Sequence, residues 1–266
     1  EDAMTRQLET AEYWIAQRRL AGATLAEMPL ELKPVDEAAG YEMQDRLLGR
    51  LTEAGKGAVV GWKIGVTTPQ MRAFLGIEAP IAGAMLAGGR LEPGARVRHR
   101  DYCRIGIECE VAMVMRTPLG GAGRVDRQAA EAAVGQIHPA IEIVDDRYGG
   151  NYRSFGVPAI IADCAFHAGF VLGAPIADWR RIDLATVTGT TSSNGKVQFT
   201  GVGADVQGHP MASLAWLANQ LACLGKRLEP GQIVLTGSLP LPYWAGPKEA
   251  IEIAIEKLGK VALQID

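Results

Sequence analysis

The chain has 266 residues, which is long enough for one large domain with a substantial hydrophobic core. Hydrophobic residues make up 48% and charged residues 21%, as in an ordinary globular protein, and the formal net charge is −3. Such a charge gives no general attraction to nucleic acids or anionic membranes, so the expected partner is a small molecule.

The cysteines and the apolar segments indicate where in the cell the protein is expected. None of the four cysteines forms a Cys-x-x-Cys pair, which fits small core residues in a reducing cytoplasm. The longest apolar run, residues 159–177, is interrupted by Asp163, His167 and glycines and is not expected to cross a membrane. We therefore expect a cytoplasmic protein.

Residues 1–75 are expected to form a small, mainly helical N-terminal part. Apolar residues at helical spacing predict an amphipathic helix over residues 4–24. A second helix is predicted to begin after Asp36, a suitable N-cap, and to end near Gly55. Neither helix carries residues that suggest chemistry.

The strand predicted over residues 58–66 carries Lys63 between a tryptophan and an isoleucine. A short helix follows at once, with Thr68 as its N-cap and Gly76 at its end, and such a junction commonly borders a site. Lys63 has two interpretations. It is either a lysine on an edge strand that extends its amine to solvent, or a cation that binds a substrate carboxylate or shuttles protons, with a pKa lowered by burial.

The chain is organised around the strand predicted over residues 105–115. Side chains alternate between the faces of a strand, so Glu108 and Glu110 point the same way, roughly 6 to 7 Å apart. Their apolar neighbours suggest burial on both faces, where two carboxylates repel each other unless a cation joins them. The alternative is an edge strand with both acids in water.

A third acid, Glu142, lies between two isoleucines in the strand predicted over residues 138–145. With Glu108 and Glu110 it would offer three carboxylates to a hard cation such as Mg²⁺ or Mn²⁺, leaving positions for water or substrate oxygens. The four histidines have no H-x-x-x-H spacing, so each is expected to be structural and not a zinc ligand.

Two further segments suggest substrate contacts. Residues 146–157 are rich in Gly, Tyr and Arg, including Arg147 and Arg153, and predict a lid or binding loop. Thr236 and Ser238 at the end of a strand offer hydroxyls to an oxyanion, with an ordinary turn as the alternative.

The rest of the chain, residues 76–266, is expected to form a β-rich catalytic domain that continues the N-terminal part. Asn194-Gly195 predicts a hairpin between strands at 187–193 and 196–202. The other expected elements are an Ala-rich helix capped by Asp126, a helix over 209–224, and strands over 232–238, 249–256 and 260–265. The predicted fold class is α+β.

Several motifs together resemble the 2-keto-4-pentenoate hydratase and 4-oxalocrotonate decarboxylase family of the fumarylacetoacetate hydrolase superfamily. The motifs are Gly61-Trp62-Lys63-Ile64-Gly65-Val66-Thr67, the pair Glu108 and Glu110, Pro139-Ala140-Ile141-Glu142-Ile143-Val144-Asp145, Gly208-His209-Pro210, and Val234-Leu235-Thr236-Gly237-Ser238. The resemblance runs from about residue 8 to the C-terminus.

This resemblance implies a mixed β-sandwich roll, a Mg²⁺ or Mn²⁺ ion held by Glu108, Glu110 and Glu142, and a Lys63 that faces the substrate. It also implies a homo-oligomer, with a sister hydratase or decarboxylase as a second candidate partner.

Two departures from the family pattern affect the expected reaction. Hydratases of this kind often show Pro-Asp-Phe-Gly where this chain has Pro80-Ile81-Ala82-Gly83, so an acid suited to water addition is missing. A Gly-Asp pair expected near Gly246-Pro247 is missing as well.

The first hypothesis is a hydratase of aromatic catabolism that adds water to a short 2-hydroxydienoate and gives a 4-hydroxy-2-oxoacid. Lys63 would act as proton shuttle or carboxylate anchor, and Arg147 or Arg153 would bind a distal group. The second hypothesis is decarboxylation of a 2-oxohex-3-enedioate, which Ile81 favours. The third is hydrolysis of an acylpyruvate, and the fourth is a non-catalytic, acid-binding partner subunit.

Overall fold

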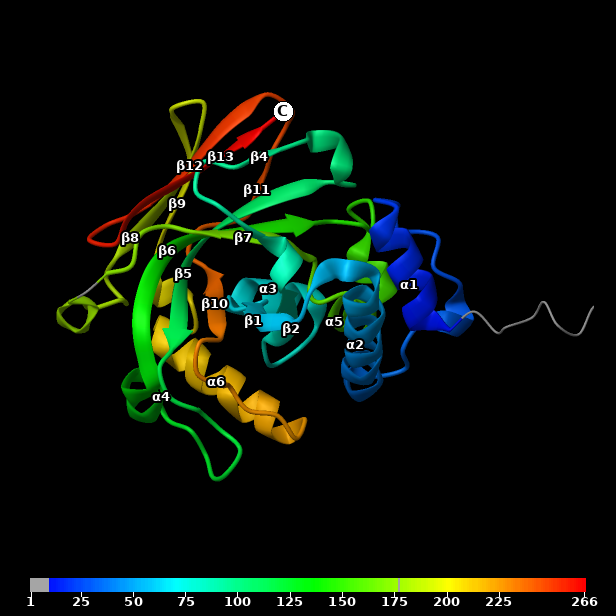
Figure 1. Ribbon diagram of the computed structural model, residues 1–266, viewed down its shortest axis with the longest axis horizontal. Helices are drawn as coiled ribbons and strands as arrows, with labels where there is room; N and C mark the ends of the chain where they lie inside the picture. The colour runs from blue at the N-terminus through cyan, green and yellow to red at the C-terminus, as the bar shows by residue number, and fades with distance from the viewer. Residues whose placement is uncertain (1–9, 177) are drawn as a thin grey trace, which may run out of the picture.

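The computed structural model describes residues 10–176 and 178–266, which form two β-sheets with helices packed around them (Figure 1). The larger, eight-stranded sheet has the order β2 (Ile81–Leu86), β1 (Val59–Gly65), β10 (Ile233–Ser238), β5 (Ile105–Met115), β6 (Val134–Asp145), β7 (His167–Leu172) and β3 (Arg90–Leu91), with β11 (Tyr243–Trp244) paired to β5. The five-stranded sheet has the order β4 (Arg96–Val97), β13 (Gly259–Ile265), β12 (Glu249–Ile255), β8 (Thr188–Ser193) and β9 (Lys196–Val202).

Six α-helices complete the described part of the chain. They are α1 (Ala11–Leu20), α2 (Glu37–Leu51), α3 (Pro69–Leu75), α4 (Arg127–Ala133), α5 (Val157–Ala162) and α6 (Pro210–Cys223). In Figure 1, α1, α2 and α5 gather at one end of the molecule, and the smaller sheet lies at the other. None of the helices in the described ranges has both the length and the apolar character needed to cross a membrane.

Short polar residues set the ends of several helices, as the sequence predicts. The carboxylate of Asp36 accepts a hydrogen bond from the backbone N–H of Ala39 at 2.8 Å, and Asp126 caps α4 in the same way. Thr68 caps α3, and Gly76 ends it with a φ of 73°, a conformation that glycine adopts without strain.

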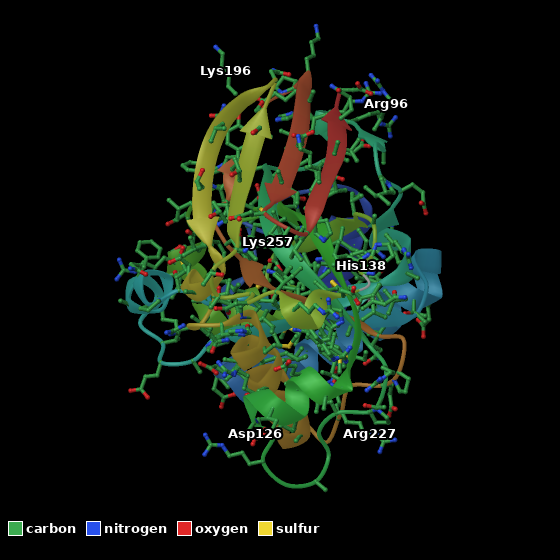
Figure 2. All side chains as sticks on the ribbon, turned by 90° about the vertical axis from the view of Figure 1, so that its left-hand side faces the viewer. Arg96, Asp126, His138, Lys196, Arg227 and Lys257 are labelled. Carbon is green, nitrogen blue, oxygen red and sulfur yellow. The ribbon has the colours of Figure 1, made fainter. Side chains whose placement is uncertain are left out.

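The predicted hairpin also forms. Asn194 and Gly195, with φ values of 49° and 75°, make the tight turn that joins β8 to β9. Figure 2 shows this hairpin with Lys196 at its tip, next to the other strands of the smaller sheet.

The two faces of β5 have different surroundings. Residues at odd positions, such as Cys109 and Val111, belong to the main hydrophobic core, which also contains the inward isoleucines of β12. Even positions carry Glu108 and Glu110 and then Ala112, which belongs to a small separate cluster with Ala140. The sheet therefore presents its acids on the face away from the main core.

Some elements differ from the expectations. The predicted N-terminal helix is observed from Ala11 to Leu20, and residues 1–9 lie outside the described part. β6 begins at Val134, four residues before the predicted start at 138. β2, β7 and α5 were not predicted. β2 has no alternation of apolar and polar residues because it is buried on both faces.

The division after residue 75 does not coincide with a boundary in the sheet. β1 belongs to the N-terminal 75 residues, yet it pairs in parallel with β10 and antiparallel with β2. The N-terminal segment therefore supplies an interior strand of the larger sheet.

Candidate metal and substrate site

Three glutamates meet on one face of the larger sheet. Glu108 on β5 lies directly opposite Glu142 on β6, and Glu110 follows two residues later on β5. One carboxylate oxygen from each lies within 4.8 Å of the others. β5 is an interior strand between β10 and β6, so the alternative of an edge strand with its acids in water is wrong.

The carboxylates have fewer partners than their burial requires. Glu110 Oε2 accepts a hydrogen bond from the backbone N–H of Gly237 at 2.8 Å, and Glu110 Oε1 has no partner. Glu142 Oε2 has no partner either, and both side chains are fully buried. Unpaired buried carboxylate oxygens carry a high desolvation cost, which a bound cation would offset. The donor set, three hard oxygen ligands, suits a divalent ion of the Mg²⁺ type.

The acids also shift one another's ionisation. Burial raises the pKa of Glu108 to about 7. Burial, together with the charges of Glu142 and Glu108, raises the pKa of Glu110 well above its ordinary value. Burial also acts to raise the pKa of Glu142, but the neighbouring cation Lys63 and a hydrogen bond from His167 outweigh it, so this pKa is lowered.

Lys63 lies beside the acids and is buried, with 3% of its surface exposed. Its Nζ donates to the carbonyl oxygen of Ala165 at 3.0 Å and lies 3.3 Å from Glu142 Oε1. The expectation of a pKa lowered by burial is wrong. Burial does act in that direction, but the negative charges of the three glutamates raise the pKa by more.

Ala165 occupies a backbone conformation that is unfavourable for its residue type. Three consecutive residues, Cys164, Ala165 and Phe166, have φ values of 56°, 51° and 67°. A run of non-glycine residues in this region costs free energy, and such runs concentrate at functional sites. Here the run turns the Ala165 carbonyl toward the amine of Lys63.

His167 is the residue of this site that the sequence analysis did not single out. Its Nδ1 lies 2.9 Å from Glu142 Oε1. Burial lowers the pKa of the imidazole, so the ring is neutral, and it donates its Nδ1 proton to the carboxylate. A single histidine at the start of a strand has many structural uses, so its position in the sequence does not indicate this role.

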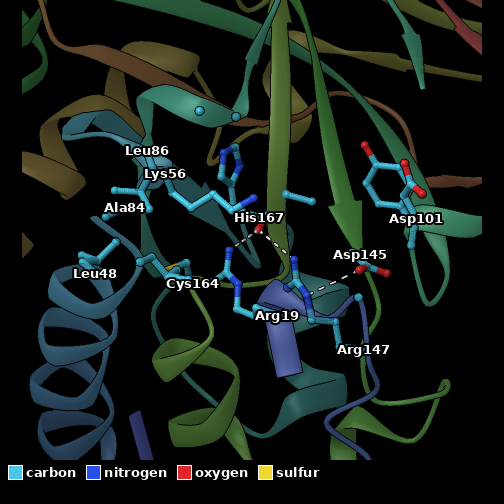
Figure 3. A pocket seen from close by; sticks show the side chains of 16 residues that line it. Arg19, Leu48, Lys56, Ala84, Leu86, Asp101, Asp145, Arg147, Cys164 and His167 are labelled. Carbon is cyan, nitrogen blue, oxygen red and sulfur yellow. Dashed lines mark hydrogen bonds and ion pairs between the residues drawn. The ribbon is translucent and has the colours of Figure 1, made fainter. Parts of the chain in front are cut away.

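Arg147 does not contact these acids. Its guanidinium binds Asp163 at 2.9 Å and Asp145 at 3.4 Å, and it lines a separate cavity of about 210 Å³ with Arg19 and His167 (Figure 3). The expectation that Arg147 binds a distal substrate group does not fit this arrangement, because buried carboxylates already occupy its donors.

The other expected substrate residues have different positions. Arg153 is exposed, with its guanidinium 5.0 Å from the ring centre of Phe74. Thr236 is buried and donates its hydroxyl to the carbonyl of Val111, so this hydroxyl is already used within the sheet. Ser238 lines a cavity of about 690 Å³ that also reaches Glu108.

A second, smaller cavity of about 90 Å³ lies between Lys63, Glu108 and a group of apolar side chains. Ile81, at the position of the missing acid, lines this cavity. Position 81 therefore contributes an apolar side chain, and no carboxylate, to the wall of this cavity.

Comparison with known proteins places this chain in a family. Residues 88–266 match the family model for the fumarylacetoacetate (FAA) hydrolase C-terminal domain. The chain is 32% identical to a 4-oxalocrotonate decarboxylase of Pseudomonas putida over 85% of this chain and 84% of the relative. It is 30% identical to a 2-keto-4-pentenoate hydratase of Burkholderia vietnamiensis over 95% and 91% of the two chains.

Solved structures agree with these relatives. The structure of 4-oxalocrotonate decarboxylase from Pseudomonas putida G7, complexed with magnesium and adipate, superposes with a TM-score of 0.89 at 28% identity over 96% of each chain. The same protein is also known in complex with calcium and acetate. The α+β fold is thus the mixed β-sandwich roll that the sequence predicts. The chain belongs to the fumarylacetoacetate hydrolase family, within which its relatives are hydratases and decarboxylases, and it is an enzyme.

Proposed function

We propose that the protein is a divalent-metal-dependent hydratase that converts a short 2-hydroxy-2,4-dienoate into a 4-hydroxy-2-oxoacid. The observation that carries this proposal is the group of three glutamates next to a buried lysine, in which the buried Glu110 and Glu142 each have an oxygen without a partner. Relatives named 2-keto-4-pentenoate hydratase and 2-hydroxyhexa-2,4-dienoate hydratase support the reaction type.

Glu108, Glu110 and Glu142 would hold the ion, which we propose to be Mg²⁺ or Mn²⁺. When bound, a divalent ion supplies Lewis-acid stabilisation to negative charge that develops on an oxygen of the substrate. Gly237 fixes Glu110 through its backbone N–H, and His167 fixes Glu142 through Nδ1. Such contacts orient metal ligands and reduce the cost of ordering them.

We assign two roles to Lys63. Its ammonium group uses two donors on the carbonyl of Ala165 and on Glu142, which leaves one N–H for a substrate carboxylate or enol oxygen. It also holds a proton at Nζ beside the reacting carbons. In the net reaction the enol oxygen loses a proton, C3 and C5 each gain one, and the hydroxyl of water bonds to C4. A buried amine in this position can relay such protons.

The test combines metal binding with turnover. The chelator-treated protein should bind one Mg²⁺ or Mn²⁺ per chain in calorimetry and should regain the ability to remove the ultraviolet absorbance of 2-hydroxypenta-2,4-dienoate. A product analysis by mass spectrometry should show the gain of water. Failure to bind metal and to turn over the dienol would support a non-catalytic, acid-binding subunit instead.

Decarboxylation of a 2-oxohex-3-enedioate is the second candidate. It is favoured by Ile81, which stands where an acid for water addition would be expected, and by the likeness to the decarboxylase of Pseudomonas putida. Release of carbon dioxide from that substrate, without gain of water, would identify this reaction.

Assembly and location are also proposals. We propose a homo-oligomer in which the edge strand β9 forms a contact, because Val197, Phe199 and Val202 are apolar and exposed there. V197D should then lower the molar mass measured by light scattering. The alternative partner for this strand is a sister hydratase or decarboxylase.

We also propose a cytoplasmic location. The four free cysteines support a reducing cytoplasm.

A further inference from the structure

The turn formed by residues 164–166, together with the next residue, His167, contacts the acid cluster and its lysine at two points. The carbonyl of Ala165 accepts a hydrogen bond from Lys63 Nζ, and the ring of His167 binds Glu142. Because all three residues of the turn are non-glycine residues with positive φ, the turn costs free energy and needs support from its surroundings. Both contacts therefore depend on what holds this turn in place.

Two arginines from distant parts of the chain bind the backbone carbonyl oxygen of His167. Arg19, in the last turn of α1, donates to it from Nη2 at 3.2 Å, and Arg147 donates from its own Nη2 at 3.3 Å. Figure 3 shows the two guanidinium groups side by side, with their hydrogen bonds converging at His167. We call this pair the arginine clamp. An oxygen held by two planar, rigid guanidinium groups has little freedom, so the peptide plane after His167 is fixed.

Asp163 joins the two arginines and is fully buried. Its Oδ2 accepts a hydrogen bond from Arg147 Nη1 at 2.9 Å, and its Oδ1 lies 3.3 Å from Arg19 Nη1, an ion contact without hydrogen-bond geometry. Asp145 lies 3.4 Å from Arg147 Nε. Two acids and two arginines thus balance in charge, which is the condition under which buried ions are tolerated.

The value of these ions lies in geometry more than in stability. Desolvation of buried ions offsets much of their attraction, so the group adds little net stability. A guanidinium, however, is a planar fork that fixes two partners at once. The fork of Arg19 spans Asp163, at the end of α5, and His167, at the start of β7, and so bridges the two ends of the strained turn.

We infer that Arg19 and Arg147 are positioning residues of the catalytic site. They fix the turn through the carbonyl of His167, and the turn holds Lys63 and Glu142 in their working positions. This inference rests on the proposed function for the roles of Lys63 and Glu142, and it extends their site to α1. Nothing in the sequence of this helix indicates such a role.

Arg19→Met tests the clamp in the full chain, because it removes one guanidinium and keeps a long apolar side chain. With Mg²⁺ present, kcat for 2-hydroxypenta-2,4-dienoate should fall by about ten-fold or more, since small displacements of catalytic groups have large effects on rate. KM should change less than kcat, because Arg19 acts through the turn. Mg²⁺ affinity in calorimetry should fall by about ten-fold, the lower end of the usual effect of residues that orient metal ligands.

The matched control is Arg18→Met on the same helix. Arg18 pairs with the exposed Glu27 at 3.2 Å and lies over the ring of Trp14, so its loss should leave kcat and Mg²⁺ affinity unchanged. Equal losses in the Arg18 and Arg19 variants would overturn the inference, because they would trace the effect to the stability of α1.

Hydrogen exchange in the metal-free protein tests the clamp independently of the proposed reaction. In Arg19→Met the backbone amides of residues 163–169 should exchange at least about ten-fold faster, while those of β12 in the smaller sheet should be unaffected. Faster exchange with normal kcat and normal Mg²⁺ affinity would reduce the clamp to a structural role and overturn the inference. Absence of turnover even in the unmodified protein, combined with the expected changes in exchange and metal affinity, would overturn the hydratase proposal and leave the clamp supported.

Arg19→Lys separates charge from geometry. It keeps a positive charge beside Asp163, but a single amine cannot reproduce the fork that reaches both Asp163 and His167. Its stability in chemical denaturation should stay close to that of the unmodified protein, while kcat should remain at least about three-fold lower. If Arg19→Met does not fold, this variant carries the test, and an unchanged kcat in it would overturn the inference.

Discussion

The Nδ1 atom of His167 lies 2.9 Å from Oε1 of Glu142, and the same oxygen lies 3.3 Å from the amine of Lys63. One carboxylate oxygen is thus held from two sides, while the other oxygen of Glu142 faces the acid cluster without a partner. The arrangement orients this carboxylate before any ligand binds.

His167→Ala should therefore weaken metal binding by about 10- to 100-fold, as is usual when a residue that orients a metal ligand is removed. The matched control is His138→Ala, which removes a buried histidine that bonds the carbonyl of Gly173. Calorimetry with Mg²⁺ compares the two variants. Equal losses in both would mean that His167 acts through general stability.

Glu110→Gln should lower metal affinity markedly, because it replaces a charged oxygen of the cluster by an amide. The neutral side chain also relieves repulsion from the other acids, so the free energy of unfolding without metal should not decrease. Chemical denaturation and calorimetry on the same sample measure both effects. Undiminished Mg²⁺ binding would contradict the role of Glu110 as a ligand.

Gly237→Ala should reduce both stability and metal affinity. Gly237 has a φ of 118°, and an added Cβ would lie 2.5 Å from Cγ2 of Thr67, so the backbone N–H that binds Glu110 must move. We expect a loss of more than about 1 kcal/mol in the free energy of unfolding. Gly231→Ala is the control, since Gly231 also has a positive φ, of 82°, but has open space around it. Metal affinity should fall only in the Gly237 variant.

Lys63→Met should reduce kcat by about 100-fold or more, because it removes the proton at Nζ and the donor for the substrate. Methionine fills a similar volume, so the buried site should stay packed. Lys63→Arg keeps the charge but not the small donor group and should also be slow. Single-turnover absorbance measurements would separate binding from chemistry, and near-normal rates in Lys63→Met would rule out the proposed role.

The cap of α6 should make part of the stability depend on pH. His209 Nδ1 accepts a hydrogen bond from the backbone N–H of Met211 at 3.0 Å, and burial lowers the pKa of this imidazole below its ordinary value. The stabilising contribution is present above the unfolded pKa of about 6.5 and is lost as pH falls through the lower folded pKa. His209→Asn, which caps without titrating, should lose less stability between pH 7.5 and 5 in urea unfolding. Parallel pH profiles would contradict this.

The glutamate pair on β5 could be predicted because it depends only on the two-residue period of a strand. The meeting of Glu108 with Glu142 could not, because it requires the register between β5 and β6, which is set by packing along the whole strand pair. His167 was missed for a related reason. Its role comes from the turn before β7, where three residues adopt conformations that the sequence does not favour.

The ionisation of Lys63 shows a second limit. The apolar neighbours of Lys63 in the sequence predict its burial. They do not predict the direction of its pKa shift, because this depends on the charges around the amine, which come from other strands. Arg147 illustrates the reverse case. A loop arginine suggests a ligand contact, and only the fold reveals Asp163 and Asp145 as its partners.

The parallel pairing of β1 with β10 has a consequence for folding. Lys63 lies opposite Leu235, so the pocket forms between segments that are far apart in the sequence. Contacts of such high contact order form late and slowly, and the pocket is complete only once the C-terminal strands have docked. An ion held by Glu108, Glu110 and Glu142 would join β5 to β6, and its affinity should depend on the docking of β10, because Gly237 of β10 donates a hydrogen bond to Glu110.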